Sequence, residues 1–174
     1  MRLKRMTKQE KSQVKILYQQ AFPKEERRPF SLLLWECKKR VMEILCVEEK
    51  GEFVGILISS FSKDLVLIEY FAINPNQRGG GIGSKVLQLV KKRYQGRRIM
   101  LEIETPDGEE IKARREEFYK RNGFQDIGVP ILFCGVNMKV LSLDGISISY
   151  EEYKKHYKKT AGLLVTKLIG ISKL

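Results

Sequence analysis

The stretch from Arg78 to Ser84 holds the residues with the clearest chemical use, because it reads Arg-Gly-Gly-Gly-Ile-Gly-Ser. Glycines leave little side-chain bulk to keep an anion away from successive backbone N–H groups. A helix that starts there would add unpaired N–H donors and the positive end of its dipole. The loop is therefore expected to bind a diphosphate, although glycine clusters also form simple turns after strands.

Two other phosphate-binding motifs do not fit the spacing of these glycines. The phosphate-binding loop of nucleoside triphosphatases, Gly-x-x-x-x-Gly-Lys-Ser/Thr, needs a lysine directly after its last glycine. Here Ser84 separates Gly83 from Lys85. A dinucleotide fingerprint, Gly-x-Gly-x-x-Gly, that starts at Gly79 would end on Ser84 rather than on glycine. The spacing excludes both motifs.

Three glutamates lie in stretches that are otherwise largely apolar: Glu69, Glu102 and Glu104. A carboxylate in such surroundings needs a partner, solvent or a function. Each is a candidate general base. Glu104 is a candidate because it shares strand parity, and so a face, with Glu102, and it ranks below the other two. The alternative for all three is an ion pair with nearby lysines and arginines, or a water chain that replaces them as the base.

Hydrophobic spacing predicts the elements that carry these groups. A helical period at Val14, Leu17 and Tyr18 indicates a helix over 8–21, and Ser31 is expected to cap a short second helix. Apolar runs bounded by turns predict strands over 42–47, 53–59, 65–73, 98–104, 124–128 and 131–140.

Two more helices are expected beside the candidate residues. One follows the glycine loop and turns Val86, Leu87, Val90 and Tyr94 to the core. The other precedes Gly123, with Ile111 and Phe118 on its core side, and Gly123 takes the left-handed position at its end.

The composition is that of one globular domain. Its 174 residues are 43% hydrophobic and 31% charged, and no signal peptide is visible, so a cytoplasmic location is expected. The single His156 and the separated Cys37, Cys46 and Cys134 predict structural thiols and no metal site. The net charge of +12 favours an anionic partner, and basic residues without an acid run from Arg78 to Met100.

The loop and its surroundings resemble the GNAT N-acetyltransferase superfamily, whose signature Gln/Arg-x-x-Gly-x-Gly/Ala is met by Arg78 to Gly83. The segments 71–75 and 117–124 are similar to the family's bulged fourth strand and its later helix and turn. The resemblance implies an α/β fold with a mixed, mostly antiparallel sheet of six to seven strands flanked by helices. It also implies that the fourth and fifth strands splay apart.

The resemblance covers roughly residues 1–141, which we expect to form the acetyltransferase domain. Residues 142–174 are then a basic C-terminal helical extension, with a helix over 150–157 and an apolar patch over 161–169. The patch is too short to span a membrane and is expected to pack on the domain or on a second subunit. A homodimer is left open.

The resemblance also assigns roles to residues. Tyr119 matches the family tyrosine that protonates the departing thiolate, and Glu102 resembles the base of ribosomal-protein alanine acetyltransferases. The strand glutamate of the histone-type branch falls on Leu67, which argues against that version of the mechanism and leaves Glu69 as the other base candidate. The cofactor-binding residues implied for acetyl-CoA are Phe71, Ala72, Ile73, Arg78, Gly79, Gly80, Gly81, Ile82, Gly83, Ser84 and Asn122.

The implied function is acetyl transfer from acetyl-CoA, without a metal, to a primary amine that attacks directly. The acceptor is left open among small molecules, antibiotics and proteins, since the loop from Ala21 to Trp35 that should choose it carries both charge signs. A non-catalytic acyl-CoA-binding module is the alternative. Nucleic-acid binding is not expected, because the chain lacks a reader motif.

Overall fold

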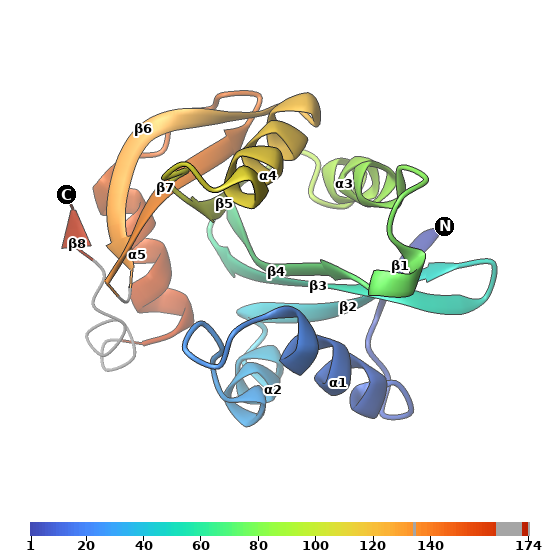
Figure 1. Cartoon of the computed structure of the whole chain (residues 1–174). Helices are drawn as coiled ribbons and strands as arrows, with labels where there is room; N and C mark the ends of the chain where they lie inside the picture. Colours follow the sequence, from blue (N-terminus) through green and yellow to red (C-terminus); the bar gives the residue numbers. More distant parts are fainter. Residues whose placement is uncertain (134, 163–171, 174) are drawn as a thin grey trace. The chain divides into compact units, whose positions relative to one another are not determined.

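A computed structural model gives the structure of the chain and describes residues 1–133, 135–162 and 172–173. Figure 1 shows the strands and helices and their order along the chain. The elements are β1 (Arg2–Arg5), α1 (Lys11–Ala21), α2 (Phe30–Lys38), β2 (Met42–Glu49), β3 (Glu52–Ser62), β4 (Leu65–Ile73), a 3₁₀ turn (Pro75–Gln77), α3 (Ile82–Arg93), β5 (Arg98–Glu104), α4 (Glu110–Arg121), β6 (Phe124–Phe133), β7 (Val136–Leu143), α5 (Tyr150–Thr160) and β8 (Ser172–Lys173).

The described strands are hydrogen-bonded in the order β1-β2-β3-β4-β5-β7-β6-β8, with β4 and β5 parallel. The pairs β1–β2, β2–β3, β5–β7, β7–β6 and β6–β8 are antiparallel. The predicted α/β fold with a mixed sheet is confirmed. The predicted count of six to seven strands is too low. The strands β1 and β8 have only four and two residues, too few to show the alternation of apolar and polar residues that identifies a strand in a sequence.

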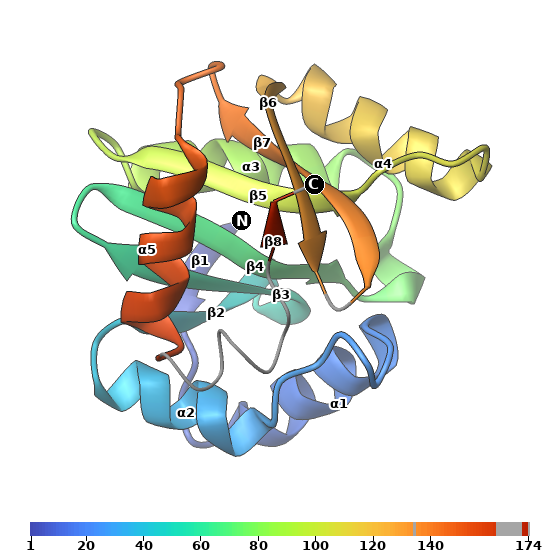
Figure 2. The same ribbon diagram turned by 90° about the vertical axis from the view of Figure 1, so that its left-hand side faces the viewer.

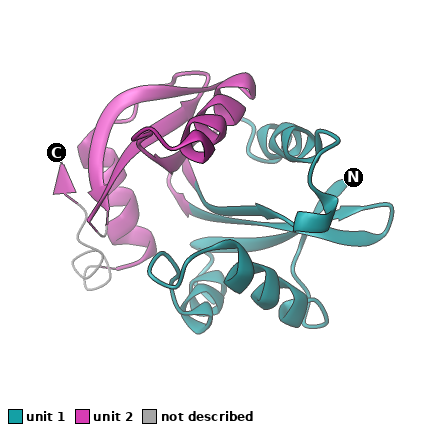
Figure 3. Cartoon of the chain, in the orientation of Figure 1, with its two compact units in different colours: residues 1–60, 68–95 teal, residues 61–67, 96–174 magenta. Residues whose placement is uncertain are grey.

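The chain divides into two compact units (Figure 3). Unit 1 comprises Met1–Ser60 and Ile68–Gln95, and unit 2 comprises Phe61–Leu67 and Gly96–Leu174. Strand β4 contributes residues to both. Whether residues 142–174 act as an extension of a domain over 1–141 stays a prediction.

In unit 1, α1 and α2 lie along one side of β2 and β3 (Figure 1). Val14, Leu17 and Tyr18 are buried, as their spacing predicts, and they share a core with Leu33 and Ile56. The predicted cap of α2 is wrong: the helix begins at Phe30 and Pro29 occupies the cap position. Proline is suited to the start of a helix, where its missing N–H leaves no bond unmade.

In unit 2, α5 packs on the strands β5, β6 and β7 through Tyr153 and Tyr157, which share a core with Met100, Ile131 and Val140 (Figure 2). A reciprocal capping box of Ser149 and Glu152 starts the helix, which is longer than the predicted 150–157. Cys134 and residues 163–169 of the predicted apolar patch lie outside the described residues.

Two further predictions for unit 2 are wrong in detail. Ile111 is 64% exposed, because it lies in the first turn of α4, so only Phe118 of the expected pair is shielded. The predicted strands over 124–128 and 131–140 are divided at the wrong place: β6 runs on to Phe133 and β7 begins at Val136. An irregularity between Asp126 and Pro130 lets β6 continue through the predicted gap.

The two described thiols, those of Cys37 and Cys46, fit the structural role that the sequence suggests. Burial raises the pKa of Cys37 to about 11 and that of Cys46 to about 12, so both thiols stay protonated at neutral pH. Among the described residues no cluster of acidic, histidine or cysteine side chains could hold a metal ion. Within the same part of the chain, no helix is long and apolar enough to cross a membrane.

Candidate functional site

The glycine loop of unit 1 has the backbone geometry that its composition predicts. Gly79, Gly80 and Gly81 have φ values of +93°, +56° and +72°, a region that residues with a Cβ rarely adopt. Gly81 occupies the cap position of α3, and nothing lies within 4 Å of a Cβ placed on any of the three. The loop therefore has open space on its Cβ side, next to the unpaired first N–H groups of α3 that suit an anion.

A cavity of about 400 Å³ lies against this loop within unit 1. Gly80, Ile82 and Lys85 of the loop and the start of α3 line it, together with Lys50 from the turn between β2 and β3. Two ammonium groups beside the positive end of a helix suit a phosphorylated ligand. Glu49 and Glu52 also line the cavity, so its walls carry both charge signs.

Strand β4 reaches the loop through residues 71–73. The Arg78 guanidinium donates from Nε to the Ile73 carbonyl oxygen at 3.2 Å, and the Asn74 N–H donates to the Val54 carbonyl at 2.9 Å. These bonds fix the end of β4 on the 3₁₀ turn and on β3. Ala72 is buried, whereas Phe71 and Ile73 are partly exposed.

Gly55 on β3 is a residue whose role the sequence reading missed. A Cβ at this position would lie 2.6 Å from the Ala72 carbonyl oxygen and 2.8 Å from Ile73 Cδ1. Only glycine allows β3 to approach so closely the segment of β4 that the cofactor is expected to contact. A glycine inside a strand pattern was the available signal.

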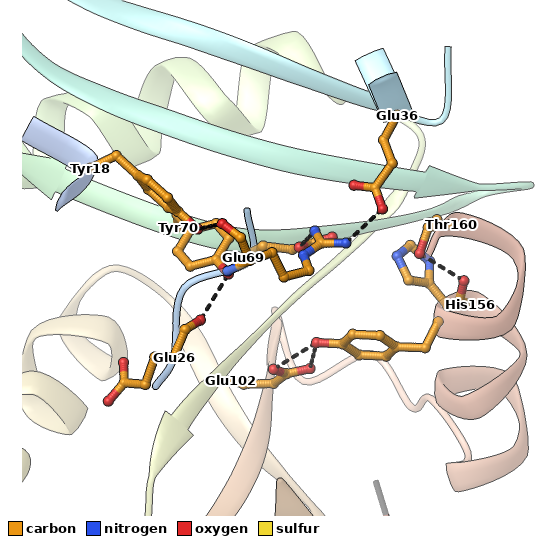
Figure 4. A network of polar contacts seen from close by, with 10 residues as sticks. Tyr18, Glu26, Glu36, Glu69, Tyr70, Glu102, His156 and Thr160 are labelled. Carbon is orange, nitrogen blue, oxygen red and sulfur yellow. Dashed lines mark hydrogen bonds and ion pairs between the residues drawn. The ribbon is translucent and has the colours of Figure 1, made fainter. Parts of the chain in front are cut away.

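Glu69, the first base candidate, is held in a buried charge cluster of unit 1 (Figure 4). Arg28 pairs with Glu69 and donates from Nη1 to Glu36 Oε1 at 2.9 Å. The side chains of Glu36 and Glu69 are 0% and 6% exposed, and each keeps one buried oxygen without a hydrogen bond. Burial raises the pKa of Glu36 to about 7, with Arg28 opposing the rise and Glu69 adding to it.

Two tyrosines tie the backbone around Arg28 to the same cluster. The Tyr18 hydroxyl donates to the Arg28 carbonyl at 3.0 Å, and the Tyr70 hydroxyl accepts from the Arg28 N–H and donates to the Glu26 carbonyl. The rings of Tyr18 and Tyr70 meet edge to face at 4.9 Å. Sequence reading missed this cluster, since nothing local links Arg28 to residues 41 and 42 positions away.

Tyr119, the predicted acid, lies on α4 in unit 2 and is partly buried. Its ring contacts those of Phe118 and Phe124 at centroid distances of 5.1 and 5.8 Å. Burial raises the pKa of Tyr119 to about 12, although Arg115 opposes the rise. The phenol is therefore protonated at neutral pH, as a proton donor must be.

Asn122, a predicted cofactor residue, caps its own helix. Its side-chain amide donates to the Phe118 carbonyl at 2.7 Å, and Gly123 follows with φ +88°, as predicted for the end of α4. The geometry of Asn122 gives it a structural role in unit 2. Its role toward the cofactor stays a prediction.

Glu102, the second base candidate, lies on β5 in unit 2 and is partly exposed. The Tyr157 hydroxyl of α5 donates to its two carboxylate oxygens, at 2.9 and 3.0 Å (Figure 4). Glu104 instead lies 3.5 Å from the Arg115 guanidinium, the ion pair that the sequence reading gave as the alternative.

The basic stretch from Arg78 to Met100 is partly neutralised. Arg93 binds the Glu43 carboxylate through two nitrogens in unit 1, and Arg98 binds Asp64 and Glu152 in unit 2. Lys85 is among the residues that line the cavity by the loop. The donor-binding candidates from Ile68 onward thus lie in unit 1, whereas Glu102, Tyr119 and Asn122 lie in unit 2.

Known proteins share both the sequence pattern and the fold. Residues 41–126 match the family model described as "Acetyltransferase (GNAT) domain". A GNAT-family protein from Bacteroides thetaiotaomicron is 23% identical with a TM-score of 0.77, and the match covers 94% of this chain and 99% of that one. No protein in the curated set matches the sequence significantly.

Two solved structures with known activities are more distant. An aminoglycoside 6'-N-acetyltransferase complexed with coenzyme A has a TM-score of 0.67 at 14% identity, covering 86% of this chain and 99% of its own. The ribosomal-protein-S18-alanine N-acetyltransferase from Escherichia coli has a TM-score of 0.64 at 12% identity, covering 86% and 96%. The chain thus carries a GNAT acetyltransferase domain, matched in sequence over residues 41–126 and in fold over most of its length.

Proposed function

We propose that the protein transfers an acetyl group from acetyl-CoA to a primary amine. The observation that carries the proposal is the open loop Gly79–Gly81 at the start of α3, beside a cavity lined by Lys50 and Lys85. Backbone N–H groups in such a loop bind the pyrophosphate of a nucleotide cofactor without a specific side chain. The names of two related folds, both N-acetyltransferases, favour an amine as the acceptor.

Acetyl-CoA supplies a thioester whose carbonyl carbon is open to attack by a neutral amine. The residues of β4 from Phe71 to Ile73 are proposed to line its pantetheine arm, with the Ile73 N–H as the donor to the thioester carbonyl. Donors held in place in this way stabilise the oxyanion of the transition state. Gly55 supports this segment, because it allows β3 to pack directly on the Ala72 backbone.

The proton transfers are assigned to Glu102 and Tyr119. Glu102 removes one proton from the incoming ammonium, and the neutral amine forms the C–N bond as the C–S bond breaks. The leaving thiolate takes the Tyr119 proton, and the second proton lost by the new amide nitrogen restores the Tyr119 phenol. The buried ion pair with Arg28 argues against Glu69, whose side chain is 6% exposed, since a base must be reached by its substrate.

A non-catalytic acyl-CoA-binding module remains the second candidate, because an open loop binds the cofactor whether or not turnover follows. A single-turnover assay of thiol release from acetyl-CoA, over a panel of amines and peptides, separates the two. Release that depends on an amine and falls in Tyr119→Phe supports the enzyme. Binding without release for every acceptor supports the module. A cytoplasmic location and a homodimer stay predictions.

A further inference from the structure

The C-terminal helix α5 contributes a side chain to the candidate base. Tyr157 lies in the second half of α5, and its hydroxyl bonds both oxygens of Glu102, 55 positions earlier in the chain. The family model ends at residue 126, so α5 lies outside the part of the chain that matches it. The contact therefore joins a residue inside the matched range to one outside it.

Packing fixes the Tyr157 ring. Only 4% of the residue is exposed, and its ring meets Tyr153 edge to face at 5.2 Å and Phe133 at 6.1 Å. A tyrosine has few rotatable bonds, so a ring packed in this way holds its hydroxyl in one place. The hydroxyl is thus a fixed donor toward the Glu102 carboxylate.

A hydrogen bond to a carboxylate favours its charged form, the form that can accept a proton. Besides Tyr157, the groups of unit 2 near Glu102 include Tyr153 on α5 and Val140, which is opposite Glu102 on β7. Glu104, two residues along β5, pairs with Arg115. Burial, and then the charge of Glu102, raise the pKa of Tyr153 well above its usual range, so Tyr153 stays neutral beside Glu102.

We infer that Tyr157 is a positioning residue for the reaction: it orients the Glu102 carboxylate and keeps it ionised, so that α5 completes the catalytic apparatus. This inference rests on the proposed function, in which Glu102 is the base. It predicts that the C-terminal helix is needed for turnover and not for binding of acetyl-CoA.

The test replaces Tyr157 with phenylalanine, which removes the hydroxyl and keeps the ring. We expect kcat to fall roughly tenfold to a hundredfold, as for the loss of one hydrogen bond to a charged group, with KM for acetyl-CoA unchanged. The acidic limb of the pH–rate profile should move to higher pH, because the carboxylate then protonates more easily. In a Glu102→Gln background the same change should have no further effect.

Tyr150→Phe is the matched control, since Tyr150 lies on the same helix and its ring stacks on Tyr153 at 6.4 Å without a hydrogen bond to Glu102. It should leave kcat and the pH profile unchanged. If Tyr157→Phe folds poorly, 3-fluorotyrosine at position 157 keeps the shape and strengthens the donor. The acidic limb should then move to lower pH.

A titration that needs no turnover separates this inference from the proposed function. The carboxyl carbon of Glu102 can be followed by NMR in protein labelled at glutamate, with Glu102→Gln to assign the signal. In Tyr157→Phe the signal should titrate at higher pH than in the wild type. An unchanged titration and kcat would overturn the inference, whereas absent turnover in the wild type with a shifted titration would contradict only the assigned function.

Discussion

At the scale of single residues, Tyr119 is the group whose chemistry and surroundings agree best. Burial raises the pKa of Tyr119 to about 12, so the phenol is protonated at neutral pH. Its ring is held by Phe118 and Phe124, which keeps the hydroxyl in a defined direction.

Replacing Tyr119 with phenylalanine should lower kcat by about 10²- to 10⁴-fold, the usual contribution of one positioned acid, and leave the affinity for acetyl-CoA unchanged. Steady-state kinetics with calorimetry of cofactor binding measures both. Because phenylalanine keeps the ring contacts, the unfolding temperature should stay close to that of the wild type. A variant with full kcat would remove Tyr119 from the mechanism.

Glu69 and Glu102 can be compared as candidates for the general base. Glu102→Gln should lower kcat and abolish the acidic limb of the pH–rate profile, since the proton acceptor is gone. Glu69→Gln should mainly lower the unfolding temperature, because it disturbs the buried pair with Arg28. The opposite assignment follows if only the Glu69 variant loses the acidic limb in a pH–rate series with both proteins.

At the scale of elements, the glycine loop and the strand before it could be predicted from sequence. β4 and β5 begin and end where their apolar runs do, because turns bound both runs. The positive φ of Gly79 to Gly81 follows from residue type as well. The exposure of Ile111 could not be predicted. Helical spacing shows which face of a helix is apolar, but it does not show whether another element covers that face along its whole length.

The loop prediction is tested by Gly81→Val. Valine is strained at φ +72° and places a side chain where the backbone is expected to meet the pyrophosphate, so affinity for acetyl-CoA should fall at least tenfold by calorimetry. Gly96→Val is the matched control, since Gly96 has φ +81°, is equally open and lies in the turn after α3. It should lower the unfolding temperature to a similar extent without weakening binding. Equal affinities for the two variants would contradict the pyrophosphate assignment.

At the scale of the whole molecule, contacts distant in sequence escaped prediction. Arg28 and Glu69 are 41 positions apart, and Tyr157 and Glu102 are 55 apart. Such pairs are created by packing of one element on another, and residue spacing carries no record of them. Glu69 and Glu102 could be nominated for their apolar surroundings, but their partners could not.

The Glu36 and Arg28 cluster predicts a pH dependence of stability. The pKa of Glu36 is about 7 in the folded protein against an ordinary 4.5, so the folded state holds the proton more tightly than the unfolded one. Stability from this group is therefore full below about pH 4.5 and falls as the pH rises through about 7. The Glu36→Gln variant keeps an acceptor oxygen for Arg28 but has no carboxyl group to titrate at position 36.

The unfolding temperature of the wild type should consequently fall more steeply between about pH 5 and pH 8 than that of Glu36→Gln. Glu25→Gln, a change at an exposed residue, is the control for losing one negative charge and should follow the wild type. Thermal unfolding followed by circular dichroism measures all three. Parallel curves for the wild type and the Glu36 variant would contradict the shifted pKa.

The proposed acetyl transfer is tested most directly by mixing the protein with acetyl-CoA and a broad panel of amines, then measuring thiol release and the mass of each amine. We predict release that requires a particular amine, together with that amine gaining one acetyl group, and both signals lost in Tyr119→Phe. Binding of acetyl-CoA with no amine-dependent release and no acetylated product would contradict the proposal.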